Sequence, residues 1–123
     1  MVVEDEVLIQ ILAKEYLEET GFNVDTAGSA AEAMNKLALI PGGVNAAIVD
    51  MGLPDQKGDV LIRELRRLHP TLPVVVTTGQ GAESTGDAFR GVPNIAFVQK
   101  PYSAAGLVSA LRSLGVHTHL ANF

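Results

Sequence analysis

The hydrophobic residues of this chain follow two spacings that alternate along its length. Apolar runs of strand length occupy residues 1–3, 44–49, 74–78 and 95–98, and residues 22–27 alternate apolar and polar side chains. Between these runs, apolar residues recur every three or four positions, the spacing of a helix with one buried face. The pattern therefore predicts strands that alternate with helices.

Local signals mark the ends of the first two predicted helices. The first spans residues 6–20 and ends at Gly21, and Ser29 with Glu32 forms a capping box that begins the second, which residues 41–43 stop. The positions expected to be buried are Leu8, Ile11, Leu12, Tyr16 and Leu17 in the first helix and Ala33, Met34, Leu37 and Ala38 in the second.

The second half of the chain predicts three more helices. One covers about residues 59–68, and a last one is capped by Ser103 and ends at Gly115. Between them, a glycine-rich stretch predicts only a short helix around residues 82–90. The expected buried positions are Leu61, Ile62, Leu65 and Leu68 in the first of these helices and Leu107, Val108, Leu111 and Leu114 in the last.

Strands that alternate with helices predict an α/β fold, a parallel sheet with right-handed crossovers and helices on both faces. In such an open, doubly wound sheet, ligands bind beyond the carboxyl ends of the strands. The chain has 123 residues, a common size for one domain, so residues 1–123 are expected to form a single domain.

Composition narrows the class of function. Nine basic residues against 14 acidic ones give a net charge of −5, which leaves no basic surface for nucleic-acid phosphates. The absence of cysteine excludes disulfides and thiolate chemistry. No apolar stretch approaches the roughly 20 residues of a membrane span, and no signal peptide is evident. We expect a cytoplasmic protein without direct nucleic-acid or membrane binding.

Reactive side chains stand where the predicted strands end. Glu4 and Asp5 follow the first strand, Asp50 closes the third, Thr78 closes the fourth and Lys100 follows the fifth. Carboxylates that meet at one place need a cation, and oxygen ligands suit Mg²⁺. The residues therefore predict a magnesium-dependent phosphoryl site, although residues 4–6 alone would also fit a solvated acidic turn at a helix N-terminus.

These positions carry a family resemblance. The chain resembles the receiver domain of bacterial two-component response regulators, whose motifs match Glu4-Asp5, Asp50, Leu53-Pro54, Gly58, Thr78-Gly79 and Lys100-Pro101 in order and spacing. The resemblance implies a flavodoxin-like fold with five parallel strands in the order 2-1-3-4-5. It also implies that Asp50 is the phosphoacceptor.

The resemblance assigns roles to the other site residues. Asp5 and Asp50 would coordinate Mg²⁺ directly, Glu4 directly or through water, and the backbone carbonyl of Gly52 would add a ligand. Lys100 would neutralise the phosphoryl oxygens, and the family holds its peptide bond to the following proline in the cis form.

The resemblance also implies a switch. Thr78 would hydrogen-bond a phosphoryl oxygen, with Thr77 as the competing assignment, and Phe97 would change rotamer as the threonine moves. The alternative for Phe97 is an ordinary core residue. Side chains at Gly52 and Gln80 would border the path of the water that hydrolyses the acyl phosphate.

The expected function is a phosphorylation-controlled signalling module rather than an enzyme that turns over a free substrate. Its phosphodonor would be a histidine kinase or a histidine phosphotransfer protein, and its output would act on an effector protein or an output domain. Homodimerisation stays open. His117 and His119 are expected to be solvated rather than metal-bound.

Three other functions compete with this expectation. A pseudo-receiver would bind partners without phosphorylation. A phosphatase with an aspartyl nucleophile is disfavoured, because Gly52 stands where such enzymes carry a second aspartate. A flavin-binding module is disfavoured because the acidic residues 4–6 would repel a phosphate.

Overall fold

The structure, a computed structural model, describes residues 1–79, 89 and 91–116. Within these residues, five parallel strands form one sheet in the order β2-β1-β3-β4-β5. The elements are β1 (Val2–Val3), α1 (Val7–Thr20), β2 (Thr26–Ala27), α2 (Ala30–Leu39), β3 (Ala47–Asp50), α3 (Gly58–Leu68), β4 (Val74–Thr78), β5 (Ile95–Gln99) and α5 (Ala104–Ser113). The predicted fold class and strand order are therefore confirmed.

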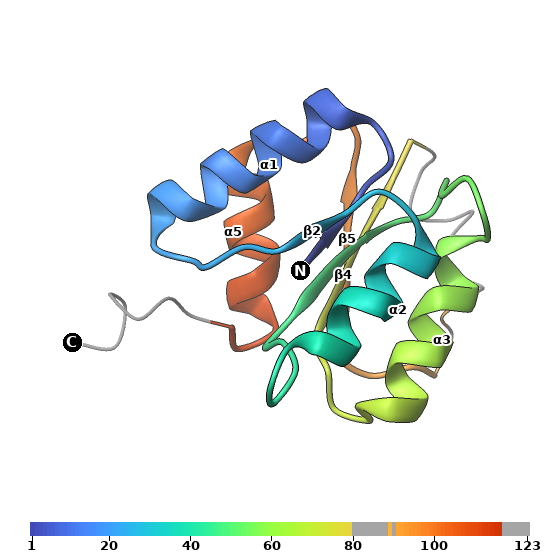
Figure 1. The fold of residues 1–123 in the computed structure, drawn as a ribbon. Coiled ribbons are helices and arrows are strands. Elements are labelled where there is room, and N and C mark those ends of the chain that lie inside the picture. The colour runs from blue at the N-terminus through green and yellow to red at the C-terminus, as the bar shows by residue number, and fades with distance from the viewer. Residues whose placement is uncertain (80–88, 90, 117–123) are drawn as a thin grey trace.

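The helices cover both faces of the sheet, α1 and α5 on one side and α2 and α3 on the other (Figure 1). Successive residues of a strand point to opposite faces of the sheet, so the strands contribute side chains to a hydrophobic core on each face. Ile48 and Val75 pack with Leu107 under α1 and α5, whereas Val49 and Val76 join the core under α2 and α3. Both faces of the central strands are buried, as their continuous apolar sequences predict.

The buried face of α1 differs from the prediction. Leu8 is 69% exposed, Ile11 46% and Leu12 37%, whereas Ala13 and Leu17 are buried. The first half of this helix carries apolar residues around much of its circumference. Periodicity alone therefore did not reveal which of two overlapping stripes faces the sheet.

The structure also differs from the prediction in the burial of two residues near helix ends and in the length of two strands. Ala38 is exposed, and Leu68 is 50% exposed, because helical spacing does not tell where along a helix the covering layer stops. The second strand comprises only Thr26–Ala27, since it pairs with just the two residues of β1. The third strand begins at Ala47 rather than at position 44.

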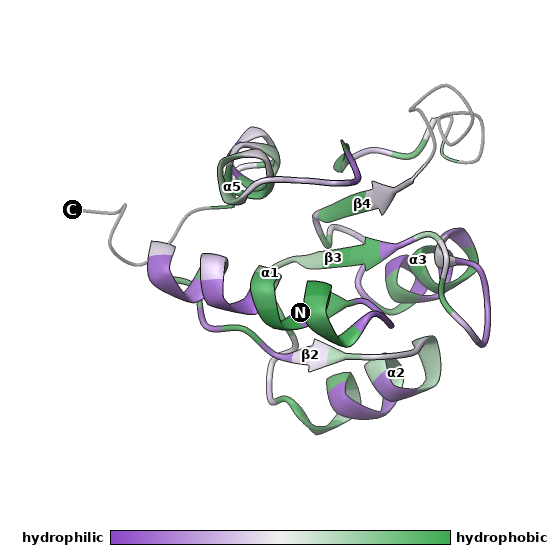
Figure 2. Cartoon of the chain, turned by 90° about the horizontal axis from the view of Figure 1, so that it is seen from above, coloured by the Kyte–Doolittle hydropathy of each residue, from purple (hydrophilic) through white to green (hydrophobic). Residues whose placement is uncertain are grey.

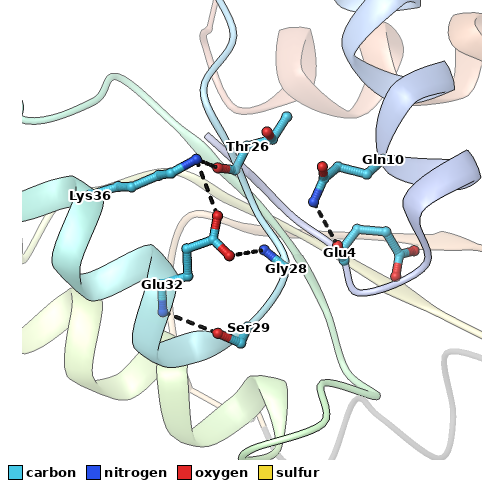
Figure 3. Close-up of polar contacts among 7 residues, drawn as sticks. All are labelled: Glu4, Gln10, Thr26, Gly28, Ser29, Glu32 and Lys36. Atoms are coloured by element: carbon cyan, nitrogen blue, oxygen red, sulfur yellow. Dashed lines mark hydrogen bonds and ion pairs between the residues drawn. The ribbon is translucent and has the colours of Figure 1, made fainter.

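The predicted helix signals are largely confirmed. Gly21 ends α1 with a φ of 110°, a left-handed conformation that glycine adopts without strain. The Ser29 hydroxyl accepts a hydrogen bond from the Glu32 N–H at 3.1 Å (Figure 3). The Glu32 carboxylate accepts from the Gly28 N–H at 3.2 Å, one residue earlier than in a standard capping box.

Some predictions fall outside the described residues. These are the short helix around residues 82–90, apart from Phe89, and the roles of Gln80, His117 and His119. In the described part of the chain, no helix combines the length and apolar character needed to cross a membrane.

Candidate functional site

The site lies at the carboxyl ends of β1, β3 and β5, where the sequence predicted it. The Lys100 ammonium, Nζ, lies 2.6 Å from Glu4 Oε1 and 3.2 Å from Asp50 Oδ2. Oxygen atoms of Glu4, Asp5 and Asp50 all lie within 4.8 Å of one another. Strand ends separated by almost the whole chain are thereby brought into one cluster.

The turn between β1 and α1 fixes Glu4. Its N–H donates to the Ala27 carbonyl at 2.9 Å, and its own carbonyl accepts from Gln10 Nε2 at 2.9 Å (Figure 3). Glu4 Oε2 accepts from the Glu6 N–H at 3.3 Å, which directs Oε1 toward Lys100. This contact confirms neither of the two roles predicted for Glu4, direct or water-mediated coordination.

Burial dominates the electrostatics of Glu4, which is 2% exposed. Burial raises the pKa of Glu4 from its ordinary value of 4.5 to about 7. The ion pair with Lys100 opposes this rise in pKa, and the negative charge of Asp50 adds to it. Glu4 is therefore a carboxyl group that gains or loses a proton near neutral pH.

Lys100 reaches the site from the residue after β5. Its N–H donates to the Thr78 carbonyl at 2.7 Å, and the Lys100-Pro101 peptide bond is cis, as predicted. Burial alone would lower the pKa of Lys100, but its ion pairs with Glu4 and Asp50 raise it above the ordinary value. The side chain therefore stays charged between the two carboxylates.

A tight backbone turn holds Asp50 at the end of β3. The Gly58 N–H donates to the Met51 carbonyl at 3.1 Å, which closes the loop of residues 51–57 at its base. A Cβ at Gly58 would lie 2.5 Å from the Asp50 carbonyl oxygen, whereas one at Gly52 would lie 3.8 Å from Asp50 Oδ2. Gly52 thus lies against the carboxylate, and Gly58 packs against its backbone.

Thr78 and Phe97 lie on neighbouring strands. Thr78 is buried, and Phe97 pairs in register with Val76, which joins the core under α2 and α3. Because side chains alternate along a strand, Thr78 faces the same side as Val76, whereas Thr77 faces the other. The Phe97 ring packs against Phe89, with ring centroids 5.8 Å apart.

The structure adds two residues that sequence reasoning missed. Asp55 accepts hydrogen bonds from the first two N–H groups of α2; in the sequence it was only one of several turn formers. Tyr102 packs beside the site, where burial and the charge of Glu4 raise the pKa of its hydroxyl to about 12. Its place directly after Lys100-Pro101 was the only available signal.

The charge balance of the cluster favours a bound cation. Within the described residues, the buried carboxylates Glu4 and Asp50 share the Lys100 ammonium, and Asp5 adds an exposed carboxylate. Glu4 Oε1 is buried and has this ion pair but no well-aligned hydrogen bond. A hard divalent cation prefers such an all-oxygen set, so the residues present fit Mg²⁺.

Comparison with known proteins adds independent information. Residues 1–112 match the family described as response regulator receiver domain. The chain is 35% identical to the virulence transcriptional regulatory protein PhoP of Salmonella typhimurium over 117 residues, which cover 93% of this chain and 50% of PhoP. It is 25% identical to the sensor kinase CckA of Brucella abortus over 114 residues, 93% of this chain but 12% of CckA.

The fold also resembles solved structures. The receiver domain of NtrX from Brucella abortus superposes with a TM-score of 0.79 at 31% identity, and the match covers 94% of this chain and 97% of that one. The chain therefore spans nearly all of a solved receiver domain but half or less of the curated relatives described above.

Proposed function

Because the chain belongs to the response regulator receiver family, we propose that it accepts a phosphoryl group on Asp50 from a histidine kinase or a histidine phosphotransfer protein. Residues 1–123 would then form one receiver domain. The observation that carries the proposal is the position of Lys100 Nζ, 3.2 Å from Asp50 Oδ2 and 2.6 Å from Glu4 Oε1 at the carboxyl ends of the strands.

The proposed reaction transfers a phosphoryl group between two side chains. An oxygen of Asp50 attacks the phosphorus of a phosphohistidine, the P–N bond breaks, and its electron pair returns to the imidazole of the donor. The product is an acyl phosphate on Asp50. Lys100 stabilises the charge on the phosphoryl oxygens. Hydrolysis later regenerates the carboxylate, so the domain catalyses only its own modification and reset.

The acidic cluster would hold Mg²⁺ through Asp5, Asp50, the backbone carbonyl of Gly52, and Glu4 either directly or through water. When bound, Mg²⁺ supplies positive charge to the carboxylates and to the phosphoryl oxygens. Its binding site would be formed by the turn after β1, by Asp50 at the end of β3 and by the loop that follows β3, so the position of that loop matters for the reaction.

The exposed aliphatic residues of α1 support a docking partner close to the site. Val7 is 68% and Leu8 69% exposed, and Ile11 and Leu12 extend the same surface by one turn. Figure 2 shows these first turns as the apolar end of the helix. The surface begins three residues after Glu4, so a helical donor bound there brings its phosphohistidine near Asp50.

The proposed output is a changed surface on β4 and β5. Thr78 would turn toward the phosphoryl group, and Phe97, on the same face of the sheet, would repack against Phe89. An effector protein or an output domain would recognise the new surface. The half of PhoP that this chain does not match leaves room for an output domain in that relative.

Two of the competing functions make different predictions. A pseudo-receiver with these carboxylates would bind its partners whether or not Asp50 is modified. A phosphatase needs a general acid after the nucleophile, and Gly52 offers none at that position. The ion pair of Lys100 with Asp50 places a cation beside the proposed phosphoacceptor, where it would stabilise the phosphoryl oxygens.

The direct test is adduct formation at Asp50. With Mg²⁺ and beryllofluoride or acetyl phosphate, the wild type is expected to form one adduct, and Asp50→Asn none, measured by fluorine NMR and intact mass. Asp25→Asn is a matched control, because Asp25 precedes β2 at the opposite end of the sheet. An adduct that survives in Asp50→Asn, or a wild type that forms none, contradicts the proposed function.

A further inference from the structure

Asp55 connects the loop after the phosphoacceptor strand to a helix elsewhere in the chain. Its Oδ1 accepts from the Ala30 N–H and its Oδ2 from the Ala31 N–H, each at 2.9 Å. The two donors are the first residues of α2. One carboxylate thus makes two hydrogen bonds across more than 20 positions of sequence.

These bonds complete the N-terminus of α2. The Glu32 N–H already donates to the Ser29 hydroxyl, and the Ala33 N–H to the Ser29 carbonyl. The N–H groups of Ala30 and Ala31 have no acceptor within α2 itself, and unpaired N–H groups at a helix N-terminus attract a negative charge. The two hydrogen bonds lower the pKa of Asp55, so this side chain is held as a carboxylate.

The other end of this contact is the loop of residues 51–57. The loop is closed at its base by the bond from the Gly58 N–H to the Met51 carbonyl, and Leu53 anchors its middle in the core. Asp55 supplies the third anchor, at the outer part of the loop. Gly52, which lies against Asp50 Oδ2, stands between the first two anchors.

We propose that Asp55 is a positioning residue for the phosphoryl site, because its two hydrogen bonds to α2 hold the loop in the shape that sets Gly52 beside Asp50. The inference rests on the proposed function, in which the Gly52 carbonyl is a Mg²⁺ ligand. Asp55 does not touch the metal or the phosphoryl group. Its effect passes through the backbone between positions 52 and 55.

Loss of this contact should weaken metal binding without removing it. Residues that orient metal ligands typically change affinity by about 10- to 100-fold when mutated. Leu53 and Gly58 still hold the loop in the variant, so the lower end of that range applies. We expect the Mg²⁺ dissociation constant of Asp55→Ala to rise about tenfold.

Glu32→Ala provides a matched control. Glu32 is a second carboxylate at the N-terminus of α2, where it accepts from the Gly28 N–H and pairs with Lys36 (Figure 3). Its partners, Gly28 and Lys36, lie within or just before α2 and not in the loop of residues 51–57, so Glu32 supports the same end of the helix without reaching the loop. A role confined to helix capping would lower the thermal stability of both variants and leave the Mg²⁺ affinity of both unchanged.

The experiment measures Mg²⁺ affinity by calorimetry and thermal unfolding in Mg²⁺-free buffer. The expected result is weaker Mg²⁺ binding in Asp55→Ala and wild-type affinity in Glu32→Ala, with the amide NMR signals of Met51 and Gly52 shifted only in the former. Wild-type affinity in Asp55→Ala, or an equal loss in Glu32→Ala, overturns the inference. If Asp55→Ala does not fold, Asp55→Asn, which keeps one acceptor oxygen, takes its place.

Mg²⁺ binding by Asp50→Asn and by Asp55→Ala distinguishes a failure of the proposed function from a failure of the role of Asp55. If the wild type binds no Mg²⁺, or if Asp50→Asn binds it with unchanged affinity, the proposed function is wrong. If the wild type binds Mg²⁺ in a manner that depends on Asp50 and Asp55→Ala binds it equally well, only the role of Asp55 is wrong.

Discussion

Gly58→Ala tests how closely the packing around α3 is tied to Asp50, the proposed phosphoacceptor. Gly58 is the first residue of α3, and a Cβ there would lie 2.5 Å from the Asp50 carbonyl oxygen and 2.8 Å from Met51 Cα. Both distances are far below van der Waals contact, and both neighbours are backbone atoms. The clash cannot be relieved by rotating a side chain, so either α3 or the end of β3 must move.

The size of the effect follows from this geometry. Inserting one methyl group into a well-packed region costs about 1–3 kcal/mol. Alanine is a better helix former than glycine by up to about 1 kcal/mol, but mainly in helix interiors, so little of this gain applies to the first residue of α3. We expect Gly58→Ala to lose about 1–3 kcal/mol, and a chain of this size loses about 4 °C in melting temperature per kcal/mol.

The assay is denaturant unfolding, combined with beryllofluoride binding in saturating Mg²⁺. Gly28→Ala is the matched control, because a Cβ at Gly28 would make only ordinary contact, 3.6 Å from Glu32 Oε2. We expect its stability to change by less than about 0.5 kcal/mol. Displacement of Asp50 should also weaken beryllofluoride binding in Gly58→Ala. If Gly58→Ala is as stable as Gly28→Ala and binds beryllofluoride equally well, the proposed steric link is refuted.

Two further predictions concern pH and switching. The pKa of Glu4 in the folded protein is about 7, above its ordinary value of 4.5. The contribution of Glu4 to stability is therefore fully present below pH 4.5 and is lost as the pH rises through 7. The free energy of unfolding falls by at most about 1.4 kcal/mol per pH unit. In Mg²⁺-free buffer, Glu4→Gln should therefore reduce the fall in unfolding free energy between about pH 5 and about pH 8, and an unchanged fall would contradict the assignment. Thr78→Ala should still form the adduct on Asp50 but lose adduct-dependent hydrogen-exchange changes in β5, and a full wild-type response would exclude Thr78 from the switch.

The sequence predicted the parts of the fold that depend on local patterns. Strand-length apolar runs and caps such as Ser29 and Gly21 depend on residues close together in the chain. The structure confirms both caps and all five strands, although β2 and β3 begin later than predicted. The choice of the buried face of α1 depends on the neighbours that this helix meets. Leu8 and Ala13 are both apolar, but only Ala13 is buried, and no local rule separated them.

In the candidate site, too, the sequence predicted residues marked by local patterns and missed a residue whose role depends on a contact across the chain. Asp50 and Lys100 were predicted because each ends a recognisable strand, and parallel topology brings strand ends together. Asp55 was missed because its partners, Ala30 and Ala31, donate through their backbone N–H groups. Such donors leave no trace in the identity of the partner residues, so only the three-dimensional structure reveals the contact.

The ion pairs of Lys100 indicate how a bound cation would change the site. Its ammonium contacts Glu4 Oε1 and Asp50 Oδ2 at once, so part of its charge is already neutralised by Asp50, the proposed phosphoacceptor. A cation held by Asp5 and its neighbours would neutralise those carboxylates in place of Lys100. The ammonium would then be available to a phosphoryl oxygen, and because the Lys100 N–H is bonded to the Thr78 carbonyl, a movement at one strand end would be transmitted to the other.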